Sequence, residues 1–245
     1  MKQFSIQHLS QSATYAVTAS VTILGLLFMG FFLAEPSITH GQIDSDDFTI
    51  TQEITGETSF LVQPTDVTTS GQIAGLTGGN ASGTTQFAVI SNNSTGYTVD
   101  IEFLSNGTAQ AMIGDDDASE AIVDYVAADD ATTDEPTYGY TSNASAQFAY
   151  TVTSDTPSDT DDSFLNFGSA CATGNGSASQ NGNSTSTKCW MGPDTDAFQI
   201  VDRNTSAPTG ATTTIEFDIT VPSNAVPVPT AQFYTATATL TLTVQ

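Results

Sequence analysis

The sequence feature that most constrains the fold is an alternation of apolar and polar residues between Gln86 and Leu104, QFAVISNNSTGYTVDIEFL. Phe87 and Val89 precede a polar Ser-Asn-Asn-Ser-Thr-Gly run, and a second apolar series follows it, at Tyr97, Val99, Ile101 and Phe103. A period of two places such side chains on one face of a strand, and Asn and Gly supply the left-handed backbone angles of a reversal. The run therefore predicts a β-hairpin with one buried face, which a second layer of structure must cover.

The end of the chain carries a second strong alternation. Apolar residues alternate from Ile215 to Val221, and a Pro-rich loop follows over residues 222–229. Alternation then returns at Tyr234, Ala236, Ala238, Leu240, Leu242 and Val244, with threonine at every intervening position from Thr235 to Thr243. Threonine is β-branched and tolerates water, so this pattern predicts a strand with one buried and one solvated face.

Shorter strand-like segments complete the pattern. They are Phe48–Ile54, Phe60–Val62, Phe148–Val152 and Phe198–Val201, while Ala121–Ala128 fits either a short helix or an edge strand. Many short strands and few helical patterns predict an all-β fold, an antiparallel Ig-like or jelly-roll-like β-sandwich. We expect one such domain over residues 42–245, with long polar loops around 105–145 and 154–197. A closed barrel is the alternative.

The first part of the chain differs in kind from the rest. Lys2 and His8 precede an apolar run from about Ala16 to Ala34, and small and polar residues follow as far as Gln42. This pattern predicts a signal peptide or a signal anchor over residues 1–41, and cleavage near Gly41 is the preferred alternative. If this segment is not cleaved, we expect it to be the only part of the protein that contacts a membrane.

The charge balance restricts the possible partners. Lys and Arg together number 3 against 27 Asp and Glu, which gives a formal net charge of -24 over 245 residues. Such a surface repels phosphate backbones and anionic lipids, so we expect no nucleic-acid binding and no electrostatic docking to membranes. A composition rich in Thr, Ser, Asn and Gly suits an extracellular or cell-surface protein.

Cys171 and Cys189 are the only cysteines. An exported chain meets an oxidising milieu, so we expect them to form a disulfide. The closed loop is rich in Gly, Ser and Asn, and a crosslink over a loop of this size contributes about 3 kcal/mol in the chain-entropy model.

Histidine is confined to the first part of the chain, at His8 and His40. A chain cleaved near Gly41 would retain none, which excludes Ser-His-Asp and Cys-His catalysis and His-based zinc sites. We therefore expect a protein that is not an enzyme. A glycan-processing enzyme with paired carboxylates needs no histidine, and it ranks third among the functions considered.

The densest acidic run holds four oxygen-bearing side chains, Asp115, Asp116, Asp117 and Glu120. Closely spaced oxygen ligands are what calcium binds, so this run is a candidate calcium site. The competing interpretation is a solvated acidic loop, because the EF-hand spacing is absent. No other cofactor is expected.

Two further patterns concern carbohydrate. Tyr138, Tyr140 and Trp190 are candidates for stacking on sugar rings if they face solvent, which would make the protein a carbohydrate-binding module. Asn-x-Ser/Thr sequons are acceptors only in an organism with the glycosylation machinery, and for a bacterial source we attribute them to composition. The eight sequons begin at Asn80, Asn92, Asn93, Asn106, Asn143, Asn175, Asn183 and Asn204.

The combination of signal segment, TGY-containing turn, one short-range cysteine pair and FYTATATLTLTV terminus resembles exported β-sandwich surface proteins of bacteria, of the pilin-like or cell-wall-associated kind. The resemblance implies a secreted or surface-displayed structural or adhesive protein. Its expected partners are further copies of itself or cell-surface glycans. A polar leader, Gln42–Asp47, followed by the apolar alternation of Phe48–Ile54, further predicts that this segment of one copy completes the sandwich of the next.

Overall fold

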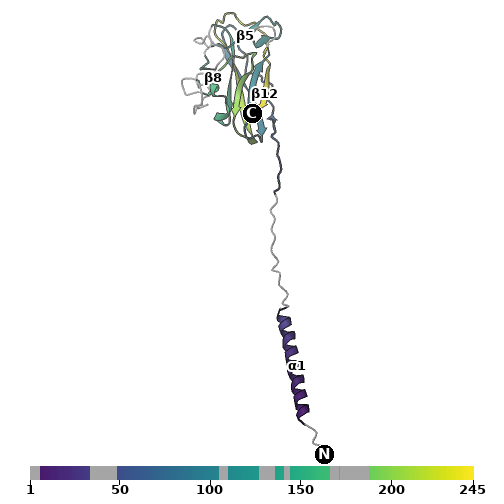
Figure 1. Ribbon diagram of the computed structural model, residues 1–245. Coiled ribbons are helices and arrows are strands. Elements are labelled where there is room, and N and C mark those ends of the chain that lie inside the picture. Colours follow the sequence, from purple (N-terminus) through teal and green to yellow (C-terminus); the bar gives the residue numbers. More distant parts are fainter. Residues whose placement is uncertain are drawn as a thin grey trace, which may run out of the picture. The chain divides into compact units, whose positions relative to one another are not determined.

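The structure is a computed structural model (Figure 1), which describes residues 6–33, 49–104, 110–126, 136–140, 144–165, 171 and 188–245. The chain forms two compact units, Met1–Glu53 and Ile54–Gln245. The first unit contains helix α1 (Ile6–Leu33), which includes most of the apolar run behind the signal or anchor prediction. Within the described residues, no helix is both long and apolar enough to cross a membrane.

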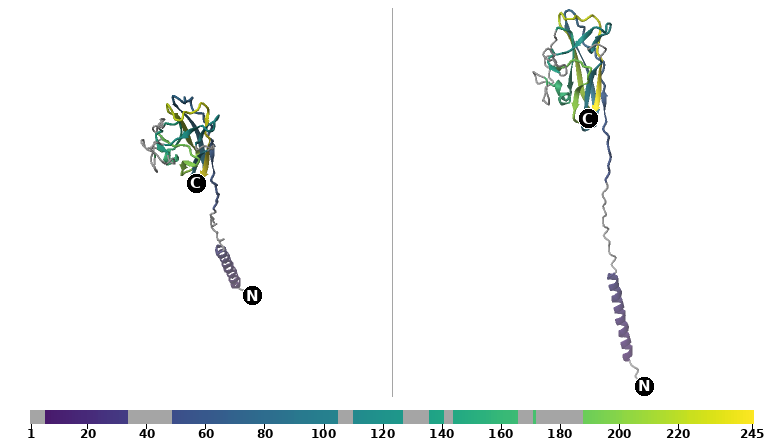
Figure 2. Two further views of the ribbon diagram at one scale, coloured as in Figure 1. Left: turned by 90° about the horizontal axis from the view of Figure 1, so that it is seen from above. Right: turned by 45° about the horizontal axis from the view of Figure 1, so that its top comes forward.

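The regular structure of the second unit consists almost entirely of strands (Figure 2), as the alternation predicts. A seven-stranded sheet has the order β1-β2-β10-β7-β5-β4-β11, a three-stranded sheet has the order β12-β3-β9, and β6 pairs with β8. The strands are β1 (Thr58–Val62), β2 (Gly79–Ser91), β3 (Tyr97–Phe103), β4 (Met112–Gly114), β5 (Ala121–Asp124), β6 (Thr137–Tyr138), β7 (Gln147–Ser154), β8 (Cys189–Trp190), β9 (Phe198–Arg203), β10 (Ala207–Val221), β11 (Tyr234–Thr235) and β12 (Ala238–Val244). Two 3₁₀ turns, Pro157–Asp159 and Asp162–Phe164, precede β8.

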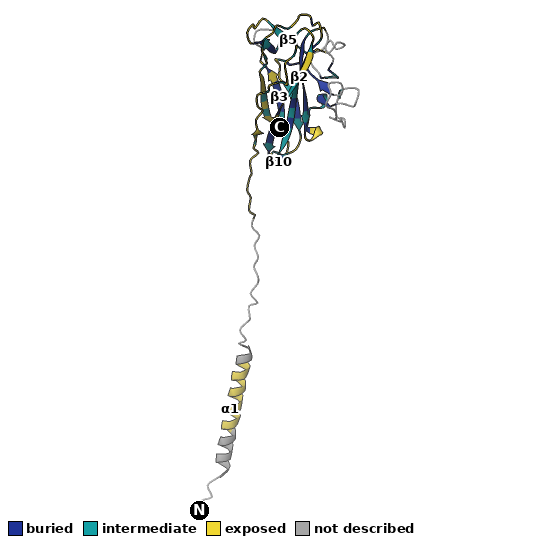
Figure 3. Cartoon of the chain, turned by 180° about the vertical axis from the view of Figure 1, so that it is seen from behind, coloured by how far each residue is buried: buried dark blue, intermediate teal, exposed yellow. Residues whose placement is uncertain are grey.

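The two larger sheets bury their apolar faces in one core. The alternate residues of β3 that begin at Tyr97 and end at Phe103 are each at most 2% exposed. The Phe103 ring centroid lies 6.2 Å from that of Phe148 and 5.4 Å from that of Tyr150, both on β7 of the other sheet. Each such side chain contributes about 1.5–3 kcal/mol when fully buried. Figure 3 shows the buried residues concentrated in the strands.

The pairing predicted for Gln86–Leu104 is wrong, although its alternation is confirmed. β2 pairs with β1 and β10, whereas β3 pairs with β12 and β9, so the two segments lie in different sheets. The turn between them carries the chain from one sheet to the other. Gly96 has a φ of 90°, and a Cβ there would overlap the carbonyl oxygen of Arg203, so this turn requires glycine.

The C-terminal alternation is confirmed in part, because Ala238 and Val244, predicted on the buried face, are exposed. Tyr234, Ala236, Leu240 and Leu242 pack against the core, and the intervening threonines are exposed. The predicted single strand is divided into β11 and β12, because Tyr234 and Thr235 pair with β4 while residues from Ala238 onward pair with β3.

Three other predictions change. Phe48–Ile54 was expected to be a strand, but residues 49–57 form no strand, and Ile50 and Ile54 are 82% and 83% exposed. Of the two alternatives for Ala121–Ala128, the strand is observed, over Ala121–Asp124, but it lies inside its sheet rather than at an edge. The expected long loops contain β4, β5, β6 and β8, whose short segments are too brief for alternation to reveal.

Candidate functional site

The predicted acidic run lies in the turn between β4 and β5. Asp115, Asp116 and Asp117 are exposed, and Glu120 is half-buried. The side-chain oxygen of Gln232 accepts hydrogen bonds from the backbone N–H groups of Asp116 and Asp117, at 2.9 and 3.0 Å. These bonds fix the backbone of the turn to the segment that precedes β11.

One carboxylate of this turn, that of Asp117, accepts hydrogen bonds from within the turn. One oxygen of Asp117 accepts from the backbone N–H and the hydroxyl of Ser119, at 2.9 and 2.7 Å, and these bonds lower the pKa of Asp117. Among the described residues, no three His, Cys, Asp or Glu side chains are grouped so as to hold a metal ion. The calcium site stays a prediction.

Two of the three predicted stacking residues do not face solvent. Tyr140 and Trp190 are 7% and 1% exposed, and they pack with Tyr125 in a second aromatic cluster. The Tyr140 ring centroid lies 4.8 Å from that of Tyr125 and 5.5 Å from that of Trp190. Tyr138 belongs to β6, and its side chain lies outside the described residues. The expected exposure of Tyr140 and Trp190 is therefore wrong, because they form an additional layer over the sheet.

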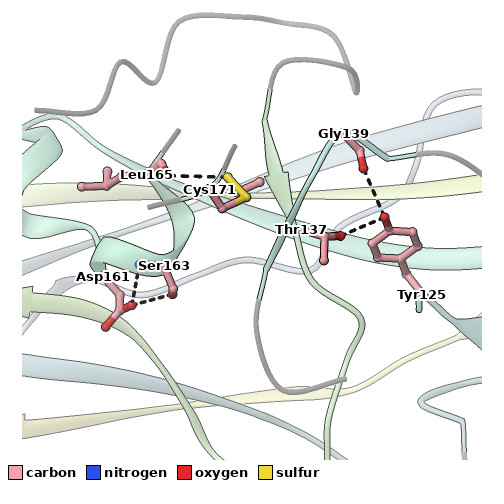
Figure 4. The surroundings of a disulfide bond; sticks show 8 residues. Tyr125, Thr137, Gly139, Asp161, Ser163, Leu165 and Cys171 are labelled. Atoms are coloured by element: carbon pink, nitrogen blue, oxygen red, sulfur yellow. Dashed lines mark hydrogen bonds between the residues drawn. A yellow bond between two sulfur atoms is a disulfide. The ribbon is translucent and has the colours of Figure 1, made fainter. Parts of the chain in front are cut away.

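The disulfide is confirmed. Cys171 and Cys189 are bonded, with 5.7 Å between their Cα atoms, and Cys189 is fully buried. Figure 4 shows the surroundings of the bond, which include the hydroxyl of Tyr125; it donates to the carbonyl of Gly139 at 3.1 Å and lies 3.0 Å from the hydroxyl of Thr137. Because Cys189 directly precedes Trp190, the crosslink connects Cys171 to the aromatic cluster that covers β7 and β10.

Charged groups that the sequence analysis did not single out lie on the face of β10 opposite the core. Asp218 is 2% exposed and Lys188 forms an ion pair with Glu216. The amide of Asn80 donates to both carboxylate oxygens of Asp218 at 2.7 Å, and Thr220 donates to one at 3.0 Å. Burial raises the pKa of Asp218, and the hydrogen bonds from Asn80 and Thr220 partly oppose this. The arrangement satisfies a buried carboxylate and has the character of a structural network.

Arg203, the other basic residue of the second unit, also forms an ion pair. The guanidinium of Arg203 forms an ion pair with Asp159 and donates to the carbonyl oxygens of Thr205 and Ser206, at 3.0 and 2.9 Å. Both basic side chains of the second unit are therefore held in ion pairs within it.

Two edge strands form a candidate interaction surface, which we call the edge flank (β1 and β12). β1 ends the seven-stranded sheet and β12 ends the three-stranded sheet, and the two strands approach each other. Within the described residues, neither is paired on its outer side. Phe60 of β1 and Leu240 and Leu242 of β12 pack against the core but are only half-buried. An unpaired edge with half-covered apolar residues is a template for strand addition.

A second apolar surface, the loop tip (Leu76, Val226 and Val228), lies at the ends of β2 and β10. All three side chains are exposed. The two loops touch, because the backbone N–H of Asn224 donates to the carbonyl of Leu76 at 3.1 Å and Gly75 lies against Val228. Sequence reasoning missed this surface because its residues belong to separate loops without periodicity.

Comparisons of the chain with models of protein families, with curated proteins and with solved structures found no match.

Proposed function

We propose that this chain is an exported, surface-displayed structural protein built on an Ig-like or jelly-roll-like β-sandwich, and that it self-associates through the edge flank. The observation that carries the proposal is the pair of unpaired edges, β1 and β12, with half-buried Phe60, Leu240 and Leu242 between them. The disulfide supports an oxidising, extracellular location.

The occupant of the edge flank is the Thr49–Ile54 segment of a second copy. This segment forms no strand in its own chain, and its two isoleucines are largely exposed. In an extended conformation Ile50, Gln52 and Ile54 share one face, because successive side chains alternate. Main-chain hydrogen bonds along the edge would supply affinity, and the two isoleucines would cover the half-buried leucines.

Association can be tested with a shortened chain. A version that begins at Gly56 retains all of β1 and loses the donor segment. Sedimentation should show that the longer exported form associates with increasing concentration, while the shortened form remains a folded monomer. A shortened form that associates as strongly as the longer one would show that Thr49–Ile54 is not the donor.

A matched pair of variants separates side-chain insertion from a general effect of charge. The double variant Ile50→Asp/Ile54→Asp should abolish association, while Thr49→Asp/Thr51→Asp, on the other face of the same segment, should weaken it much less. All four positions are exposed in the isolated chain, so folding should be unaffected. Equal losses from both pairs would argue for electrostatic repulsion rather than a buried apolar face.

The loop tip favours a second candidate function, adhesion. Contiguous exposed apolar side chains commonly mark contact surfaces. The variant Leu76→Ser/Val226→Ser should reduce binding of the protein to an apolar surface without lowering its melting temperature. Undiminished binding would exclude the loop tip as the adhesive surface.

A further inference from the structure

The number of sequons exceeds what composition explains. The chain has eleven asparagines, and eight of them begin an Asn-x-Ser/Thr sequence. Ser and Thr together make up 66 of the 245 residues. If these residues were placed at random, about three of the eleven asparagines would begin a sequon. The excess argues against attributing the sequons to composition and points to N-linked glycosylation.

Four sequons lie within the described residues, and three of their asparagines have structural tasks. Asn80 donates to the buried carboxylate of Asp218. Asn92 donates to the carbonyl of Thr55 at 3.1 Å and accepts from the backbone N–H of Glu57 at 2.6 Å, which fixes the chain ahead of β1.

Asn93 is engaged in the same way. Its side-chain amide donates to the carbonyl oxygens of Gly96 and Gln245, at 3.1 and 2.8 Å. A glycan replaces one N–H of the amide and adds bulk at that nitrogen. In the folded chain it would therefore disrupt the bonds made by Asn80, Asn92 and Asn93.

Asn204 differs from these three. It lies in the turn between β9 and β10 and is exposed, and its side chain forms no hydrogen bond with the described residues. The turn itself is fixed, because Arg203 donates to the carbonyl oxygens of Thr205 and Ser206 and is ion-paired with Asp159. The Asn204 amide is thus presented to solvent on an anchored turn.

We infer that Asn204 is a glycan acceptor. The co-reactant is an oligosaccharide carried as an anomeric phosphate ester on a membrane lipid, and a glycosyltransferase of the export compartment joins the two. A bond forms between Nδ2 and the anomeric carbon, and the bond from that carbon to the phosphate oxygen breaks. The lipid phosphate leaves with the electron pair, and the proton lost from Nδ2 passes to a base. The disulfide is consistent with passage through such a compartment.

The distribution of basic residues makes this site directly measurable. Trypsin can cut only after Lys2, Lys188 and Arg203. After reduction and denaturation, the fragment 189–245, or 204–245 if Arg203 is also cut, contains Asn204 as its only sequon. The fragment that ends at Lys188 contains the other seven. The protein should be purified from its native host, and the mass of each fragment compared with the sequence.

The C-terminal fragment should be heavier than its sequence by whole sugar residues. The variant Ser206→Ala, which keeps the asparagine but removes the sequon, should restore the unmodified mass, and Ser206→Thr should keep the added mass. An unmodified C-terminal fragment would overturn the assignment of Asn204, whether or not the other fragment is heavier. Added mass that persists in Ser206→Ala would also overturn it, since the modification would then not depend on the sequon.

Discussion

Asp124 is a half-buried carboxylate on β5, and its pKa is raised to about 7, chiefly by burial. The backbone N–H of Ala111 donates to both carboxylate oxygens at 3.1 Å and opposes the shift, while the charge of Asp194 adds to it. An aspartate in an unfolded chain has a pKa of about 3.9. Between about pH 4 and 7 the folded chain therefore holds a proton that the unfolded chain has lost. The stabilisation is complete below about pH 4 and is lost as the pH rises through 7.

We expect the melting temperature to fall as the pH is raised from 5 to 8. The pKa values of Asp100, Asp159, Asp162 and Asp218 are also raised, so these groups act in the same direction. Thermal unfolding followed by circular dichroism across this range would measure the effect. A melting temperature that rises with pH would contradict the prediction.

The variant Asp124→Asn should reduce this dependence. It removes a charge that is unfavourable at pH 8 and keeps an oxygen that can accept from Ala111. We expect a gain of about 1–2 kcal/mol at pH 8, less than the full shift implies because the carboxylate is partly solvated, and little change at pH 4. Asp116→Asn, in the exposed turn, is the control. An equal gain in both variants would indicate relief of net charge instead.

Residue-level prediction succeeded where periodicity determines burial. Val99 and Ile101 were expected in the core from alternation alone, and both lie there. The burial of Asp218 could not be predicted in this way, because alternation assigns the charged face of β10 to solvent. It is buried because β8 and the Tyr125–Tyr140–Trp190 cluster cover that face, and this layer comes from short segments without periodicity.

The disulfide joins β8 to a residue 18 positions earlier in the chain. The double variant Cys171→Ala/Cys189→Ala should lower the free energy of unfolding by about 3 kcal/mol, since the unfolded chain regains the entropy of an open loop. Chemical denaturation would measure the loss. We expect the core strands to remain folded, because Cys189 lies outside the main core.

The control for this variant is the oxidised parent protein, examined with and without a reductant. Reduction should reproduce most of the loss. If the double variant were as stable as the oxidised parent, the crosslink would not constrain the unfolded chain, and its role would lie in folding or protease resistance.

At the level of elements, alternation predicted most strands correctly, with Phe48–Ile54 as an exception, but not their partners. The segments β2 and β3 are separated by a short turn, and a hairpin is the simplest connection for such a turn. The apolar faces of both strands satisfy burial equally well when the strands face each other across the core. The pairing is decided by long-range neighbours, β10 for β2 and β12 for β3, which no local pattern contains.

For the whole molecule, calcium binding at the acidic turn would be detected as an increase in the stability of the folded state. A ligand that binds only the folded state stabilises it by about 2.7 kcal/mol at a hundredfold excess over Kd. We expect millimolar calcium to raise the melting temperature relative to a chelator. Asp115→Asn/Glu120→Gln should abolish the increase. A rise that sodium chloride of equal ionic strength reproduces would reflect screening of the net charge, and the turn would then be solvated and unoccupied.

The proposed export predicts two covalent changes in the protein isolated from its host. Intact mass should show loss of the segment up to about Gly41, together with two hydrogens fewer than the reduced chain because Cys171 and Cys189 are bonded. Any glycan mass must first be removed or subtracted. Retention of the first unit would contradict cleavage near Gly41, and free thiols would contradict an oxidising location.

The engagement of Lys188 with Glu216 has a practical consequence for labelling. Lys188 is the only lysine after Lys2, and it is buried in its ion pair. Aldehydes and active esters, whose carbonyl carbons are attacked by neutral amines, therefore meet no accessible lysine on the folded second unit. Reagents that activate carboxylates would meet many. Labelling of cell-surface proteins with amine-reactive reagents would therefore detect this protein poorly. Aldehyde fixation would leave it largely uncrosslinked.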